Sequence, residues 1–232
     1  MMYGAPLVFL QQKMQEVQMN VGFVGAGGMA QALAGKWTDK HRVMLSGRDM
    51  DKTQTAADAL GVQAGSAADA VAFADVVVLA TRSEDVFTAI DTAGGADAFA
   101  GKIVVDINNP ISVETFLTTR DDGRSLTEAI ADALPGAHVG KAFNMAQVAV
   151  WADPDMTFDG RQMVTLYTAD ADAAGPISQL IADVGAEPLL LGDNGHAYQL
   201  EAAAAMVIKF LFAGADPHTI FSFIRPETKP IR

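Results

Sequence analysis

Near its N-terminus this chain of 232 residues reads Val21-Gly22-Phe23-Val24-Gly25-Ala26-Gly27-Gly28-Met29-Ala30-Gln31-Ala32-Leu33. A short apolar run ends in glycines and a helix-forming run follows at once, which predicts a buried strand, a tight turn and the start of a helix. In this G-x-G-x-x-A pattern Gly25 suits the tight turn, Gly27 lets the backbone approach a pyrophosphate, and Ala30 lets the helix pack closely on the strand. The free N–H groups of the first helical turn attract phosphates. The stretch therefore predicts a dinucleotide site; the alternative is a glycine-rich turn in an α/β protein that binds no nucleotide.

Apolar runs continue to alternate with helical runs along the chain. Strands are expected at residues 42–45, 62–64, 75–80, 102–107 and 138–143. The continuous apolar run at 75–80 is typical of a central parallel strand that is covered on both faces. The alternation predicts an α/β fold, a doubly wound and mostly parallel Rossmann sheet with a short C-terminal strand–helix extension.

The last third of the chain predicts that extension. We expect a segment outside the core at 151–160, strands at 161–167 and 187–191, a helix at 171–184, and a long apolar helix at 196–213. Apolar residues recur at near-helical spacing in the long helix, at Leu200, Met206, Val207, Phe210 and Leu211. A face this apolar is expected to be buried against the sheet or against a second subunit, which would make a homodimer.

No linker rich in Pro, Gly or Ser divides the chain. Residues 19–214 are therefore predicted to form a single dinucleotide-binding domain with a small C-terminal part for substrate or dimer contacts. Residues 1–18 are expected to be a disordered extension, and residues 215–232 a tail.

The composition excludes several classes of function. The formal charge of −12, from 16 basic and 28 acidic residues, argues against nucleic acid or an anionic membrane as partner. The absence of cysteine excludes disulfides, thiolate catalysis and cysteine metal sites, and the four histidines lack metal-binding spacing, so no metal is expected. No apolar run reaches the ~18 residues of a membrane span. We expect a soluble, cytoplasmic protein whose partner is a small molecule.

The end of the second strand indicates which dinucleotide binds. An NAD site usually carries Asp or Glu there, whereas this chain carries Ser46-Gly47-Arg48, with Asp49 one step beyond the usual place. An Arg guanidinium can pair with a 2′-phosphate, and a serine hydroxyl can donate to it. The sequence therefore favours NADP(H) over NAD(H).

Taken together, these residues resemble the F420-dependent NADP oxidoreductases. The resemblance runs from about residue 20 to about residue 214. It rests on the glycine pattern, Ser46-Gly47-Arg48, the run from Lys102 to Asp106 that leads to Asn109-Pro110, Lys141-Ala142-Phe143-Asn144, Gly185-Ala186-Glu187-Pro188, Gly192 and Glu201. The reductase domain of six-transmembrane metalloreductases has a similar plan. Pyrroline-5-carboxylate reductase shares the opening motif, but its helical C-terminal domain does not fit here.

The resemblance implies a role for each candidate site residue. The pyrophosphate would lie on Gly25, Ala26, Gly27, Gly28 and Met29; the 2′-phosphate on Ser46, Gly47 and Arg48; the nicotinamide ribose on Ala80 and Thr81; and the ring near Asn109 and Pro110.

Arg82 departs from the family, whose members commonly have an apolar or proline-containing loop at this place. It would either meet an anionic group of the second substrate or be a solvated surface charge, and the sequence leaves both alternatives open.

The implied function is hydride transfer between NADPH and coenzyme F420. The alternatives are NADPH-dependent reduction of a flavin, a ferric chelate or a cyclic imine, or a sensor that binds NADP(H) without turning it over. No side chain is expected to be catalytic, because hydride transfer needs two rings held face to face more than it needs an acid or base. His138 and His196 are conceivable proton donors, but lone histidines at such positions are more often structural.

Overall fold

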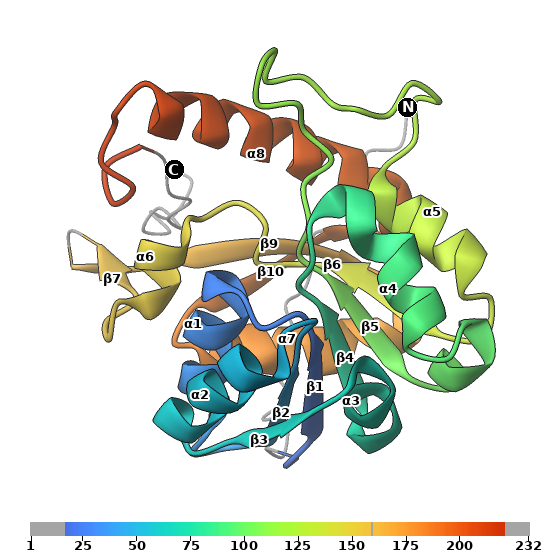
Figure 1. The fold of residues 1–232 in the computed structure, drawn as a ribbon. Coiled ribbons are helices and arrows are strands. Elements are labelled where there is room, and N and C mark those ends of the chain that lie inside the picture. The colour runs from blue at the N-terminus through green and yellow to red at the C-terminus, as the bar shows by residue number, and fades with distance from the viewer. Residues whose placement is uncertain (1–16, 159, 221–232) are drawn as a thin grey trace, which may run out of the picture.

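The apolar runs form the strands of the structure, a computed structural model that describes residues 17–158 and 160–220. The strands are β1 (Asn20–Val24), β2 (Arg42–Ser46), β3 (Gln63–Gly65), β4 (Val76–Leu79), β5 (Ile103–Asp106), β6 (His138–Lys141), β7 (Thr157–Phe158), β8 (Arg161–Gln162), β9 (Val164–Ala169) and β10 (Glu187–Gly192). Eight of them form one sheet in the order β10-β9-β6-β5-β4-β1-β2-β3, while β7 and β8 form a separate two-stranded hairpin (Figure 1).

The sheet is mostly parallel. The pairs from β3 through β2, β1, β4 and β5 to β6 are all parallel, β6 and β9 are antiparallel, and β9 and β10 are parallel again. All four residues of β4 are fully buried, as expected for a central strand. This confirms the predicted α/β fold. It also places the carboxyl ends of β1, β2, β4 and β5 at one edge of the sheet, where ligands bind in such folds.

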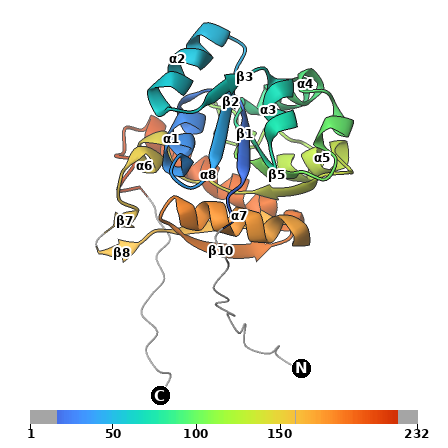
Figure 2. The same cartoon turned by 90° about the horizontal axis from the view of Figure 1, so that it is seen from below.

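Helices cover both faces of the sheet (Figure 2). They are α1 (Gly28–Trp37), α2 (Met50–Leu60), α3 (Ala67–Phe73), α4 (Val86–Thr92), α5 (Leu126–Ala133), α6 (Val148–Ala152), α7 (Ala171–Asp183) and α8 (Ala197–Phe212), with short 3₁₀ turns η1 (Ser83–Asp85), η2 (Ala96–Phe99) and η3 (Asn194–His196). One apolar core contains residues of α1, α2 and α7, and a second contains residues of α3, α4 and α5. In the first core the Trp37 ring lies 5.7 Å from Phe23 and 5.6 Å from Phe143, between centroids.

The helices begin in two different ways. Asp49, Ser66, Ser125 and Asp170 each accept a hydrogen bond from a backbone N–H in the first turn of α2, α3, α5 and α7. Helix α1 instead begins after Gly27, without a capping side chain and without an acidic residue in its first turn. The first turn of α1 is therefore suited to an anionic ligand.

Two boundaries predicted from the sequence are wrong. The segment 151–160, predicted to lie outside the core, begins with the last two residues of α6, and of these Trp151 is buried and lies edge-on against Phe143 at 5.3 Å. The strand predicted at 161–167 is interrupted at Met163, because its first two residues pair with β7 and the rest joins the main sheet as β9.

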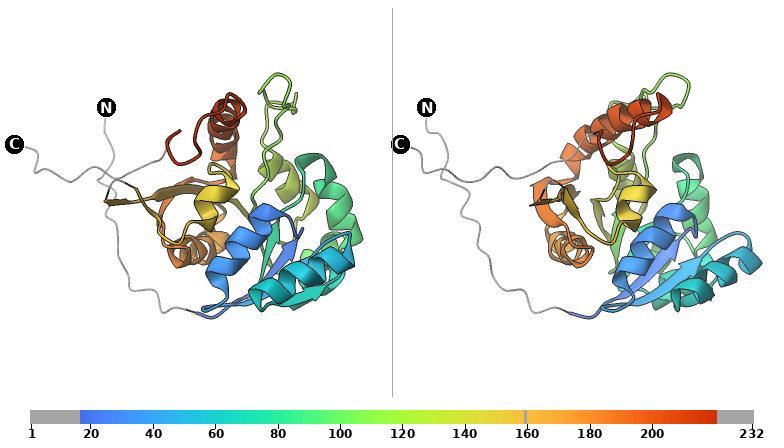
Figure 3. Two further views of the ribbon diagram at one scale, coloured as in Figure 1. Left: turned by 60° about the vertical axis from the view of Figure 1, so that its left-hand side comes forward. Right: turned by 90° about the vertical axis from the view of Figure 1, so that its left-hand side faces the viewer.

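Helix α8 is only partly buried. Leu200 and Val207 pack inward, whereas Met206 and Phe210 are each 55% exposed, so within one chain only part of the apolar face is buried. In both views of Figure 3 the helix lies beside the loop 107–125, and the rings of Phe116 and Phe212 are 5.5 Å apart. The helix and this loop thus form one wall beside the strand ends.

The chain ends lie mostly outside the described residues. Of the predicted extension only Val17 and Gln18 are described, and the Val17 carbonyl accepts a hydrogen bond from Gln179. Of the predicted tail, residues 215–220 are described and contain no helix or strand. No helix in the described part of the chain has the length and apolarity to cross a bilayer.

Candidate functional site

Three loops meet where β1, β2 and β4 end. Gly25 adopts φ +122°, and a Cβ placed on it would lie 2.2 Å from the Ala80 carbonyl oxygen, so only glycine fits. Its N–H donates to the Ser46 carbonyl at 2.9 Å. A Cβ on Gly47 would lie 3.3 Å from Ala26. The glycine turn is thus held between the ends of the two neighbouring strands.

Gly27 differs from Gly25 because nothing blocks it. A Cβ on Gly27 would meet no atom within 4 Å, and one on Gly28 would meet only Val148, at 3.3 Å. The space in front of Gly27 is therefore open, and it lies at the uncapped start of α1. Such a place fits a pyrophosphate that must approach the backbone closely.

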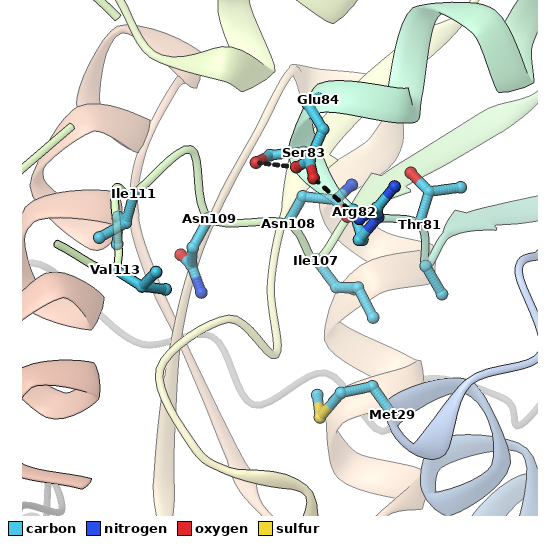
Figure 4. Close-up of a pocket in the computed structure, with 11 residues that line it drawn as sticks. Met29, Thr81, Arg82, Ser83, Glu84, Ile107, Asn108, Asn109, Ile111 and Val113 are labelled. Carbon is cyan, nitrogen blue, oxygen red and sulfur yellow. Dashed lines mark hydrogen bonds and ion pairs between the residues drawn. The ribbon is translucent and has the colours of Figure 1, made fainter. Parts of the chain in front are cut away.

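A pocket opens beside this turn, with a volume of about 450 Å³ (Figure 4). It is lined by Met29, Ala80, Thr81, Arg82, Ser83, Glu84, Ile107, Asn108, Asn109, Ile111 and Val113. In Figure 4 Ile111 and Val113 lie on one side of the opening and Thr81 and Arg82 on the other. The pocket therefore lies between the ends of β4 and β5, with Met29 of α1 at its edge.

Hydrogen bonds fix the asparagines of the pocket wall. Asn108 Nδ2 donates to the Leu79 carbonyl at 3.0 Å, which ties the end of β5 to the end of β4. Asn109 and Asn144 bond reciprocally, Asn109 Nδ2 to the Asn144 carbonyl at 2.8 Å and Asn144 Nδ2 to Asn109 Oδ1 at 2.9 Å. Thr81 lines the pocket, and its buried hydroxyl has no protein partner.

A cluster of buried charges lies behind this wall. Lys141 Nζ is 2.7 Å from Asp106 Oδ2, 3.2 Å from Glu201 Oε1 and 2.6 Å from the Asn108 carbonyl. The three charged side chains are each no more than 1% exposed. Glu201 Oε1 also accepts from the Leu126 N–H at 2.9 Å, at the start of α5. The cluster thus joins β5, β6, α5 and α8 to the pocket wall.

Glu201 is the least compensated member of this cluster. Asp106 accepts bonds from Lys141, from Thr127 and, twice, from Asn108. Glu201 Oε2 is buried without a partner. Burial raises the pKa of the Glu201 carboxyl, and the Asp106 charge adds to that effect, while Lys141 opposes it. The single positive charge of Lys141 can balance only one of the two carboxylates, so the charges of the cluster are balanced when Glu201 carries a proton.

The end of β2 is further from the pocket. Ser46 is buried, and its hydroxyl donates to the Phe23 carbonyl at 2.7 Å, so in this structure it holds β1 and β2 together and does not face a ligand. The Asp49 carboxylate caps α2. Arg48 is exposed and reaches Asp85, at 3.5 Å from Nη1 to Oδ2.

The structure thus brings most of the predicted site residues to one edge of the sheet. Met29, Ala80, Thr81, Arg82 and Asn109 line the pocket, and the glycines lie beside it. Pro110 is buried and does not line the pocket. The two histidines lie elsewhere and pair with acidic residues, His138 with Asp172 and His196 with Asp193.

Several pocket residues were not predicted, and they are Ser83, Glu84, Ile107, Asn108, Ile111 and Val113. Asn108 could have been inferred from the sequence, because it directly precedes Asn109 at the expected end of a strand. The residues at 111 and 113 stand in a long polar loop whose path the sequence does not determine.

Known proteins resemble this chain in sequence. Residues 20–110 match the family described as NADP oxidoreductase, coenzyme F420-dependent. Over 183 residues the chain is 28% identical to metalloreductase STEAP3 of Rattus norvegicus, a match that covers 78% of this chain. The chain spans 36% of the length of that relative.

Solved structures resemble it in fold. A protein of Arthrobacter sp. FB24, described as a candidate F420-dependent NADP reductase, is 26% identical with a TM-score of 0.79, over 89% of this chain and all of the other. Protein SMa0349 from Sinorhizobium meliloti is 27% identical with a TM-score of 0.67, over 90% of this chain and 97% of the other. A reductive aminase of Aspergillus terreus in complex with NADPH and ethyl levulinate, 19% identical with a TM-score of 0.64 over 85% and 64%, shares the fold alone.

Proposed function

We propose that this chain transfers a hydride between NADPH and a flat redox acceptor, and that the acceptor is coenzyme F420. The match of residues 20–110 to the family described as NADP oxidoreductase, coenzyme F420-dependent, supports the proposal. The observation that carries the proposal is the pocket of about 450 Å³ beside the glycine turn, at the carboxyl ends of parallel strands. Ligands bind at that edge in doubly wound folds.

The residues present fit NADP(H). The open space before Gly27 and the uncapped first turn of α1 suit the pyrophosphate. Thr81 offers a buried hydroxyl without a protein partner at the wall where the nicotinamide ribose is expected. Arg48 offers an exposed guanidinium where the 2′-phosphate is expected. Arg48 is thus the proposed side-chain donor to the 2′-phosphate. Ser46, also predicted to contact it, instead holds β1 to β2.

Hydride transfer requires little acid–base catalysis by the side chains. Bound NADPH supplies the hydride at nicotinamide C4, and the acceptor takes it. The chain's own task is to hold both rings face to face and to exclude water between them. Fixed asparagines on one wall and the apolar side chains of Met29, Ile107 and Ile111 on the others suit that task. No described residue of the pocket is assigned a catalytic role.

A second candidate function comes from the similarity to a metalloreductase. It would be NADPH-dependent reduction of a ferric chelate. A sensor that binds NADP(H) without turnover is the remaining candidate.

The acceptor is tested by mixing the purified protein and NADPH with F420, FMN, ferric citrate or a cyclic imine, and following oxidation of the nicotinamide. We expect the highest kcat/KM with F420. Equal rates with F420 and FMN would remove the deazaflavin assignment, and tight NADPH binding without oxidation by any acceptor would favour the sensor.

A matched pair of variants tests whether the acceptor binds in the pocket. Val113 lines the pocket, whereas Thr115 lies on the same loop, is also exposed, and does not line it. Because F420 is acidic, Val113→Glu should raise its KM by about 10-fold through like-charge repulsion, and Thr115→Glu should change it little. Equal effects of the two variants would place the acceptor elsewhere.

A further inference from the structure

Two arginines from different loops meet one carboxylate at the edge of the site. Arg82, which follows β4, donates to Asp85 Oδ2 from Nη2 at 3.0 Å and from Nε at 3.2 Å. Arg48, which follows β2, places Nη1 at 3.5 Å from the same oxygen. The carboxylate thus links the ends of β2 and β4, one on each side of β1.

Asp85 does not cap a helix. It ends the 3₁₀ turn η1 and directly precedes α4, and its side chain makes no capping hydrogen bond, whereas Asp49 and Asp170, in extended backbone before their helices, do. The side chain of Arg48 is 85% exposed and that of Arg82 is 66% exposed. Ion pairs so open to water add little to stability. Neither capping nor stability therefore accounts for the arrangement.

We propose that Asp85 stands in the place of the cofactor's 2′-phosphate, and that Arg48 and Arg82 together form the 2′-phosphate site. This inference rests on the proposed NADP(H) function and adds two residues to it. Arg82 would attract the phosphate, and Asp85 would compete with it. Two guanidinium groups that converge on one oxygen match the charge-assisted, bidentate contacts that a phosphate receives. The carboxylate keeps the two cations together when no phosphate is present, and the arriving dianion must displace it.

The charges of the site determine whether loss of the Asp85 charge strengthens or weakens NADPH binding. Arg48 and Arg82 carry two positive charges, and Asp85 with Glu84, whose Oε1 lies 3.4 Å from Arg82 Nη1, carries two negative charges. The site is therefore close to neutral although it must attract an anion. NADH lacks the 2′-phosphate and leaves the Arg–Asp contacts undisturbed. Removal of the Asp85 charge should thus strengthen NADPH binding and leave NADH binding unchanged.

This inference assigns Arg82 differently from both alternatives that the sequence left open. Its guanidinium is directed to the carboxylate that Arg48 also reaches, so it serves the adenosine end of the cofactor. Arg82 also lines the pocket, but its guanidinium is bonded to Asp85, so in this proposal it contacts the cofactor's 2′-phosphate and not the acceptor.

The test is titration of NADPH and NADH against the full chain and four variants, with thermal melts to show that each variant is folded. Arg48→Ala and Arg82→Ala should each weaken NADPH binding by about 10-fold or more and change NADH binding by less than about 2-fold. Asp85→Asn should strengthen NADPH binding by about 3- to 10-fold at low salt. Asp91→Asn, further along α4, makes the same charge change away from the arginines and should change neither affinity.

The outcomes separate this inference from the function on which it rests. If Arg48→Ala leaves the preference for NADPH intact, the NADP(H) site itself is wrong. If Arg48→Ala abolishes the preference but Arg82→Ala does not, or if Asp85→Asn leaves NADPH binding unchanged or weaker, the inference alone is overturned. A rise in the KM for F420 with Arg82→Ala, at unchanged NADPH affinity, would also overturn it and would return Arg82 to the acceptor.

Discussion

At the scale of single residues, Glu201 is a buried carboxyl whose ionisation is opposed by its surroundings. Burial raises the pKa of its carboxyl above the ordinary value of about 4.5. A carboxyl whose pKa is higher in the folded state than in the unfolded state favours folding while it is protonated. That contribution is complete below the unfolded pKa and is lost as the pH rises through the folded pKa.

Glu201→Gln should remove this pH dependence. The amide oxygen can accept from Leu126 and Lys141 as Glu201 Oε1 does, and no charge forms at alkaline pH. We expect the unfolding free energy of the wild type to fall as the pH rises above the ordinary carboxyl pKa of about 4.5, and that of the variant to change less over the same range. Urea denaturation at several pH values measures both. Parallel pH profiles would show that Glu201 is already ionised in the folded protein.

At the scale of elements, two glycines of the turn between β1 and α1 have different roles. Gly25→Ala should destabilise the fold, because its φ of +122° and the Ala80 carbonyl at 2.2 Å leave no room for a Cβ. Gly27→Ala should leave the melting temperature nearly unchanged, since its Cβ would meet no protein atom within 4 Å. The methyl group would instead occupy the space proposed for the pyrophosphate.

We therefore expect Gly27→Ala to weaken NADPH binding by about 10-fold or more at unchanged stability, from the loss of charge-assisted hydrogen bonds. Calorimetric titration together with a thermal melt measures both quantities on one sample. Unchanged affinity in a folded Gly27→Ala variant would show that the cofactor does not approach this turn.

The same elements show how far the sequence could predict the structure. The order of strands and helices, the glycine turn and the polar residues at the ends of β2, β4 and β5 follow from local patterns, because each strand and its following loop are contiguous in the chain. The burial of Trp151 does not follow, since it depends on α6 packing against Phe143. Nor does the break at Met163, where a hairpin competes with the main sheet for the same run.

The charge cluster could not be predicted for a related reason. Asp106 and Lys141 each appear in the sequence as a polar residue at the end of an apolar strand, which is a signal for some role. Their meeting with Glu201 depends on the parallel pairing of β5 with β6 and on the return of α8 to that edge. Contacts between residues so far apart in the chain cannot be inferred from any short stretch of the sequence.

At the scale of the whole molecule, the uncovered face of α8 is the main feature that one chain leaves unexplained. Met206, Phe210 and Phe212 are at least 55% exposed, and Leu117 on the neighbouring loop is 66% exposed. Exposed apolar patches of this kind mark association surfaces. We propose that a second copy of the chain covers this face, so that the protein is a homodimer.

Phe210→Glu should then shift the protein from dimer to monomer in sedimentation velocity runs at micromolar concentration, because it would bury a charge at the interface. Val17→Glu, at an exposed residue of the N-terminal segment, adds the same charge away from α8 and should leave the dimer intact. A wild-type protein that sediments as a monomer would exclude the proposed interface.

The central claim is direct hydride transfer between NADPH and F420 across the pocket. A single-turnover reaction with NADPH that carries deuterium at both C4 positions of the nicotinamide, followed by mass spectrometry of the reduced acceptor, tests it. One deuterium should be recovered on the deazaflavin ring, because direct transfer between two rings held face to face would not pass through water. Reduced F420 without the label, or no reduction of F420 at all while NADPH is bound, would contradict it.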